Sequence, residues 1–129
     1  MTNPFYCKLY IDTSEELSNV QSRLDGLVKI EFPSFSVEAV TFRNENYIQT
    51  TNLSSEFYPI ERSRYYVELD VESVDDSELD AFQCGVARVV KVLREGGWFV
   101  VASCDFEEVI SAETGWNWSR ENPMQPVQQ

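Results

Sequence analysis

Carboxylates in three short runs are the side chains of this sequence best placed to do chemistry. The runs are Glu68-Asp70-Glu72, Asp75-Asp76-Glu78-Asp80 and Asp105-Glu107-Glu108. The first run alternates along an expected strand, where residues two apart share a face and lie about 7 Å from one to the next. Such a row could hold Mg²⁺ or Ca²⁺ through oxygen ligands, remain a solvated face, or pair with the lysines and arginines of a partner.

The other two runs stand where helices are expected to begin. Acidic side chains in a first helical turn are stabilised by the helix dipole and by capping, which accounts for them locally. Paired carboxylates also serve as acid and base in some enzymes. None of the runs has the D-x-D-x-D-G spacing of a calcium loop.

Several common catalytic groups are missing from the chain. It has no histidine, which is the commonest general base and metal ligand, so Ser103 and Cys104 have no partner of that kind. Gly96-Gly97 precedes a strand instead of opening a helix, and is interpreted as a turn and not a phosphate loop. We therefore predict a protein that is not an enzyme, with no catalytic residue, cofactor or metal ligand.

The net charge of −12 on 129 residues indicates the kind of partner. Such a charge repels nucleic acid and anionic membrane surfaces, and it favours a cationic protein. The three cysteines, Cys7, Cys84 and Cys104, have no CxxC spacing and are predicted to be free thiols. No apolar run approaches the roughly 20 residues of a membrane span, and residues 1–4 lack the character of a signal peptide. These features predict a cytoplasmic protein that binds neither nucleic acid nor membranes.

The spacing of apolar residues predicts the elements that position these side chains. Alternation predicts strands at 5–11, 28–32, 35–42, 65–71 and 98–104. The last is apolar at nearly every residue, which is typical of a strand that is central or covered on both faces. Residues 43–63 lose the pattern apart from a possible short strand at 47–51, and are interpreted as a hairpin excursion or a partner-binding loop.

Three helices are predicted from capping boxes and apolar stripes. The boxes are Thr13 with Glu16, Asp75 with Glu78, and Asp105 with Glu108. The first helix starts its stripe at Leu17 and is expected to stop at Gly26, the second ends at Gly96-Gly97, and the third is short and runs through Ile110.

This order of elements predicts an α+β fold, the ferredoxin-like β-α-β-β-α-β sandwich. The antiparallel sheet would carry both long helices on one face, and a short C-terminal helix would follow. Residues 1–121 form a single domain, and the tail at 122–129 is expected to be disordered. The face without helices would present an acidic and tyrosine-rich surface made of Tyr6, Lys8, Tyr10, Tyr66, Glu68, Asp70 and Glu72.

Two tryptophans near the C-terminus, Trp116 and Trp118, are costly to leave exposed to water. They fit a lid that closes the core, an edge strand, or an aromatic anchor in an interface. On a strand they would face the same side.

A small, strongly acidic domain without catalytic equipment resembles the immunity proteins of bacterial toxin systems. The resemblance is one of overall character across the chain, and it implies a protein that neutralises a basic toxin by covering its active site or an adjacent surface. The residues expected to contact the partner are Tyr66, Glu68, Asp70, Glu72, Asp75, Asp76, Asp105, Trp116 and Trp118. The alternatives are a structural or regulatory homo-oligomer that pairs through an exposed sheet edge, and a small carboxylate- or metal-dependent enzyme.

Overall fold

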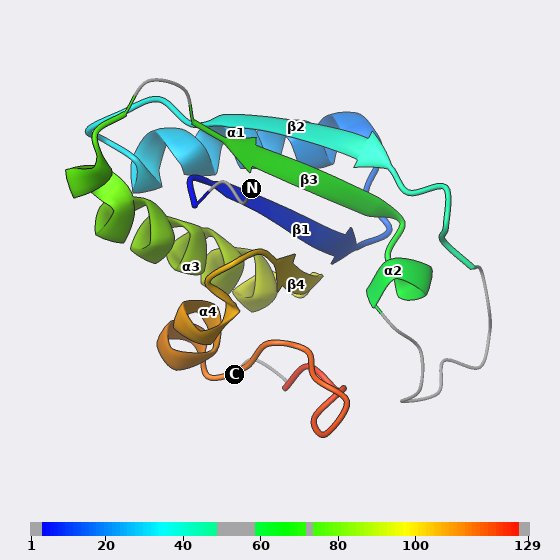
Figure 1. Cartoon of the computed structure of the whole chain (residues 1–129). Helices are drawn as coiled ribbons and strands as arrows, with labels where there is room; N and C mark the ends of the chain where they lie inside the picture. Colours follow the sequence, from blue (N-terminus) through cyan, green and yellow to red (C-terminus); the bar gives the residue numbers. More distant parts are fainter. Residues whose placement is uncertain (1–3, 49–58, 72–73, 127–129) are drawn as a thin grey trace.

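The computed structural model describes residues 4–48, 59–71 and 74–126. Within these ranges the chain forms a mixed α+β structure (Figure 1). The strands are β1 (Tyr6–Asp12), β2 (Glu38–Arg43), β3 (Tyr65–Asp70) and β4 (Phe99–Ser103). The helices are α1 (Leu17–Glu31), α2 (Pro59–Arg62), the 3₁₀ turn η1 (Asp76–Glu78), α3 (Leu79–Glu95) and α4 (Glu107–Thr114).

The four strands form one antiparallel sheet in the order β2-β3-β1-β4. The register places Tyr10 of β1 opposite Tyr66 of β3 on one side and Val101 of β4 on the other. Tyr66 in turn lies opposite Phe42 of β2. The α+β class and the antiparallel sheet predicted from the sequence are confirmed.

The core lies between one face of this sheet and the two long helices, α1 and α3 (Figure 1). Phe82 of α3 is fully buried at its centre, with ring centroids 5.7–5.8 Å from those of Phe5, Phe32 and Phe106. A Cβ on Gly85 would lie 2.3 Å from the Phe32 ring, so only glycine lets α3 pass this close to the end of α1. The further buried side chains include Cys7, Leu9, Ile11, Val20, Leu24, Val67, Leu69, Val86 and Val89.

The first long helix is longer than the sequence predicted. It continues through Gly26 to Glu31, so the strand expected at 28–32 is wrong. The reason is that Val28 extends the buried stripe of Leu24, and Gly26 lies on the exposed side where it interrupts no packing. The helix ends before Pro33, because the residue before a proline is disfavoured in helical conformation. The next strand begins at Glu38 instead of 35.

The three predicted capping boxes are also wrong in their pairings. No side chain caps the N-termini of α1, η1 or α4. Thr13 instead accepts a hydrogen bond from the Glu15 N–H at 3.3 Å. In α4 the helix begins two residues after Asp105, so Glu107 rather than Glu108 reaches back, and it accepts the Cys104 N–H at 3.2 Å.

β4 is an edge strand, although it is covered on both faces as its apolar sequence predicted. Val100 and Ala102 join the main core, while Phe99 and Val101 form a second cluster with Trp116 on the opposite face. The segment after α4 supplies this cover, which explains how an edge strand can be apolar at nearly every residue.

The segment from Asn122 to residue 126, in the region where the sequence predicts a disordered tail, makes hydrogen bonds at and beside β4. Gln125 binds the backbone of β4, and the Asn122 carbonyl accepts the Trp116 indole N–H at 2.8 Å. Residues 127–129 lie outside the described ranges.

In the 43–63 region the structure adds α2 and places Tyr47 and Ile48 in no strand, and residues 49–58 lie outside the description. Among the described helices, none is both long and apolar enough to cross a membrane.

Candidate partner-binding face

The sheet surface turned away from α1 and α3, here called the outer face, carries most of the side chains that the sequence singled out. Nine residues of three strands make it up, and each is partly or fully exposed. They are Tyr6, Lys8 and Tyr10 of β1, Tyr66, Glu68 and Asp70 of β3, and Glu38, Val40 and Phe42 of β2. The outer surface of β4 is excluded because Trp116 covers Phe99 and Val101.

An aromatic row crosses the outer face from β2 to β1. Phe42 and Tyr66 are stacked, with ring centroids 5.0 Å apart and an interplanar angle of 19°. Tyr10 follows at 6.4 Å from Tyr66. Phe42 and its neighbour Val40, both on the edge strand β2, are each 36% exposed. The row therefore offers exposed apolar surface to a partner.

Lys8 lies over this row. Its ammonium Nζ is 4.4 Å from the Tyr66 ring centroid and 5.3 Å from that of Tyr10, within the range of cation–π attraction. In the part of the chain that the structure describes, no carboxylate comes within ion-pair distance of Lys8. The rings, and not an acid, hold its charge.

The carboxylates of the face follow the aromatic row along the strands, with Glu68 next to the row and Asp70 and Glu38 beyond it. Glu68 stands opposite Lys8 in register, but its Oε2 accepts the hydroxyl of Tyr6 at 2.6 Å. Burial raises the pKa of the Tyr6 phenol, and the hydrogen bond to Glu68 and its negative charge raise it further. Asp70 and Glu38 are paired in register at the next position and are exposed. The face thus carries three acids and one lysine.

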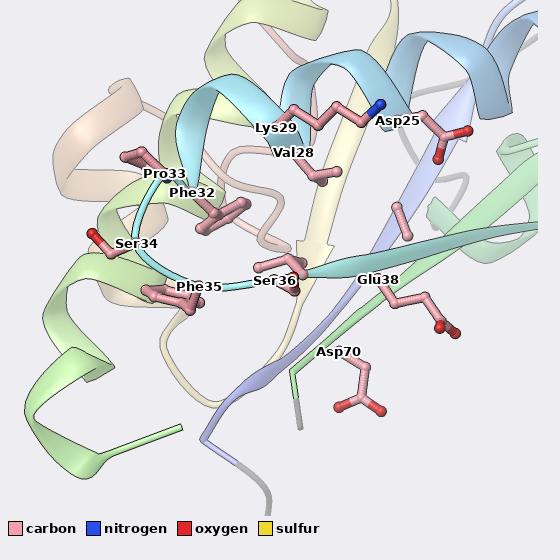
Figure 2. Close-up of a pocket in the computed structure, with 12 residues that line it drawn as sticks. Asp25, Val28, Lys29, Phe32, Pro33, Ser34, Phe35, Ser36, Glu38 and Asp70 are labelled. Atoms are coloured by element: carbon pink, nitrogen blue, oxygen red, sulfur yellow. The ribbon is translucent and has the colours of Figure 1, made fainter. Parts of the chain in front are cut away.

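A hollow of about 1120 Å³ adjoins the outer face where α1 leads into β2 (Figure 2). Figure 2 shows Asp25 and Lys29 on the α1 side of this hollow and Glu38 and Asp70 on the strand side. Phe32 and Phe35 line its inner wall. The hollow therefore continues the outer face, from the exposed acids Glu38 and Asp70, around the start of β2.

The free edge of β2 is closed by a side chain. Gln21 of α1 donates from Nε2 to the Ala39 carbonyl at 2.7 Å and accepts the Thr41 N–H on Oε1 at 2.8 Å. One amide thus takes the place of a neighbouring strand at two backbone groups.

The free edge of β4 is closed in the same way along most of its length. Asn117 pairs with both backbone groups of Ala102, with each bond at 3.0 Å. Gln125 donates to the Trp98 carbonyl at 3.0 Å and accepts the Val100 N–H at 2.9 Å. These contacts occupy the groups through which another strand would pair.

Arg94, the last basic residue of α3, completes the closure of β4. Its side chain is 2% exposed, and its guanidinium donates to the carbonyl of Val100 at 2.8 Å and to that of Trp116 at 2.8 Å. It also donates to Thr114 Oγ1 at 2.9 Å. Burial lowers the pKa of Arg94 to about 10. The side chain joins α3, β4 and the segment that covers β4.

The sequence-predicted partner residues separate into two groups. Tyr66, Glu68 and Asp70 lie on the outer face, whereas Asp75, Asp76 and Asp105 are exposed at helix starts away from it. Glu72 lies outside the described residues.

The two tryptophans lie in neither a strand nor a helix. Trp116 is 3% exposed, and Trp118 is half-buried and packs against the same cluster. Trp116 therefore serves as a lid over Phe99, which is one of the roles expected from the sequence, and it presents little surface of its own.

The sequence reasoning missed three residues of the outer face, Glu38, Val40 and Phe42. Alternation of Val40 and Phe42 with Ala39 and Thr41 was the available signal. This alternation places Val40 and Phe42 on the sheet face opposite to the buried Ala39.

The described residues contain no group of three His, Cys, Asp or Glu side chains placed to hold a metal ion. The three cysteines are free. Burial raises the pKa of Cys7, and a hydrogen bond from Cys7 lowers that of Cys104. What the outer face offers chemically is binding, through rings and carboxylates that both attract cations.

No protein-family model matches the chain, and no curated protein or solved structure does so either.

Proposed function

We propose that this chain is a non-enzymatic binding protein that neutralises a basic protein partner, in the manner of an immunity protein that blocks a toxin. The observation that carries the proposal is the composition of the outer face. The long helices pack on the opposite face of the sheet, and the outer face exposes Val40 and Phe42 and carries three carboxylates, of which Glu68 is next to the aromatic row. Apolar anchors with acidic neighbours suit a cationic protein surface.

Charge complementarity argues for the chemistry of that partner. The chain has 22 acidic and 10 basic residues, so its field attracts a basic protein and orients it during encounter. Nucleic acid and anionic membranes would be repelled by the same field. Blockade needs no catalytic group on this chain, because covering the partner's working surface is enough.

The bonds at the sheet edges favour binding of a partner through the outer face over the alternative of a homo-oligomer that pairs through a sheet edge. Pairing through an edge strand needs free backbone groups. Asn117 and Gln125 occupy such groups along β4, and Gln21 occupies the Ala39 carbonyl and the Thr41 N–H of β2. The enzyme alternative gains no support from the described residues, which hold no metal-ligating trio.

The proposal extends to the fold and the compartment. We assign the ferredoxin-like β-α-β-β-α-β arrangement, which is supported by the central position of β1 and β3 and by the placement of α1 and α3 before β2 and β4. We place the protein in the cytoplasm, where the free thiols of Cys7, Cys84 and Cys104 would stay reduced.

The test is capture from the native host at low and physiological salt with three baits. These are the unaltered chain, Val40→Lys on the outer face, and Ile30→Lys on α1 as the matched control, since Ile30 is 70% exposed. We expect one basic protein to be retained by the unaltered chain and the control but lost by Val40→Lys. The purified protein should then be inhibited by an equimolar amount of the chain.

Two results would overturn this proposal. If no basic protein were recovered at either salt concentration, the result would contradict the proposal that the chain has a basic partner. Equal recovery by Val40→Lys and Ile30→Lys would remove the outer face as the binding surface.

A further inference from the structure

The position of Lys8 carries an inference about how the outer face recognises its partner. Lysines on strands usually extend into water or pair with an acid. Here the ammonium lies against two rings, 4.4 Å from the Tyr66 centroid and 5.3 Å from that of Tyr10. The aromatic row therefore already holds a cation in the unbound protein.

The carboxylate next to that cation is turned away from it. Glu68 lies opposite Lys8 in the β1–β3 register, but it accepts its hydrogen bond from Tyr6 at 2.6 Å. A carboxylate has about four acceptor positions, so this bond leaves Glu68 able to accept further hydrogen bonds. A cation that displaced Lys8 would find the ring surface that Lys8 now covers and a carboxylate acceptor beside it.

We propose that Phe42, Tyr66, Tyr10 and Glu68 form an arginine-binding platform, and that the ammonium of Lys8 occupies it until an arginine of the basic partner displaces it. This inference rests on the proposed function and names the partner group that the outer face takes.

Arginine fits the platform better than lysine for three reasons. Tyr66 is already stacked on Phe42, at 19° and 5.0 Å between centroids, so the face of Tyr66 that Lys8 occupies is a fixed flat surface on which a planar guanidinium can stack. A guanidinium is less strongly hydrated than an ammonium, so it loses less on entering. Its several N–H donors can also reach Glu68 while the plane remains stacked.

The experiment is an NMR titration of the full chain with two blocked amino acids, N-acetyl-arginine amide and N-acetyl-lysine amide. The ring signals of Phe42, Tyr66 and Tyr10 report on the platform. We expect arginine to shift these signals with an affinity several-fold above that of lysine. Removing the resident cation with Lys8→Met should tighten arginine binding several-fold.

The matched control is Lys29→Met, because Lys29 is exposed on α1 and its loss changes the net charge equally. That variant should bind arginine like the unaltered chain. Ring signals that ignore arginine, equal responses to arginine and lysine, or equal gains from Lys8→Met and Lys29→Met would each overturn the inference.

The outcome is separable from that of the proposed function. If a basic protein is captured through the outer face while the rings ignore arginine, the platform is wrong and the function stands. If arginine binds the rings but no basic protein is captured, the platform stands as a cation site and the toxin-blocking role is removed.

Discussion

Asn117 pairs with Ala102 as a neighbouring strand would, with its Nδ2 donating to the Ala102 carbonyl and its Oδ1 accepting the Ala102 N–H, both at 3.0 Å. Gln21 makes an equivalent pair of bonds to Ala39 and Thr41 on the opposite edge. Side-chain amides thus end the sheet on both sides. Because exposed edges invite pairing between chains, these bonds disfavour association through the occupied parts of both sheet edges.

Replacing Asn117 with alanine should lower the free energy of unfolding by about 2–3 kcal/mol, because two backbone groups of buried Ala102 lose their partners. Urea denaturation measures the change. Asn19→Ala is the control, since Asn19 binds only exposed Glu15 and its loss should cost about 0.5 kcal/mol or less. Equal effects of the two variants would contradict a role for Asn117 in closing β4.

Gln21→Ala should open the edge of β2 and cause self-association. The Ala39 carbonyl and the Thr41 N–H would then be free to pair with a second copy of the chain. Size-exclusion chromatography with light scattering should find concentration-dependent dimers for Gln21→Ala. The same measurement should find none for Asn19→Ala, which removes an amide from the same helix. A strictly monomeric Gln21→Ala would show that the amide does not protect this edge.

Arg94→Lys should destabilise the protein by about 2–3 kcal/mol, because an ammonium cannot reach the acceptors on Val100, Trp116 and Thr114 together. Tryptophan fluorescence should shift to the red as the covering segment, which carries Trp116 and Trp118, loosens. Arg88→Lys is the control on the same helix, since Arg88 forms an exposed ion pair with Glu31. A stable Arg94→Lys variant with unchanged fluorescence would contradict the role assigned to Arg94.

The sequence predicted the regular elements well wherever an apolar pattern had one interpretation. The alternation at 65–71 matched β3, and the stripe from Leu79 to Leu93 matched α3. It failed at 28–32, where Val28, Ile30 and Phe32 alternate like a strand. The helical conformation of residues 28–31 is explained by the burial of Val28 in the same stripe as Leu24. Local patterns do not record such tertiary contacts.

The outer face was partly predictable from the sequence, whereas the side chains that close the sheet edges were not. Tyr66, Glu68 and Asp70 followed from simple alternation along one strand. The roles of Gln21, Asn117, Gln125 and Arg94 depend on partners up to 27 residues away in sequence, and nothing about a glutamine or an arginine alone indicates such a partner. Trp116 shows the same limit, because its burial depends on Phe99.

Tyr6 should make stability fall above about pH 10. Its pKa is raised in the folded state by burial and by Glu68, so from about pH 10 upward the folded protein holds a proton that the unfolded chain has lost. Folding therefore loses stability as pH rises through this range. Tyr6→Phe should flatten that fall in urea denaturation measured at pH 9 to 11.5.

Absorbance at 295 nm gives a second measurement of the same group. The difference between the unaltered chain and Tyr6→Phe isolates the titration of Tyr6, whose midpoint should lie above that of a free tyrosine. Glu68→Gln should move the midpoint down, because it removes the negative charge that opposes the phenolate. A midpoint near the free value in the unaltered chain would contradict the coupling.

Association with the basic partner should depend on charge at the outer face and not only on total charge. Asp70→Lys should lower the association rate constant by about tenfold at low salt, and the loss should shrink as salt screens the field. Glu113→Lys makes the same change in net charge on exposed α4, away from the face. Because charges close to the binding surface affect the encounter more than distant ones, Glu113→Lys should lower the association rate constant several-fold less than Asp70→Lys does. Stopped-flow measurements from 20 to 500 mM salt separate the two effects. Equal slowing by both variants would mean that net charge alone governs the encounter, and rates indifferent to salt would argue against an electrostatic partner altogether.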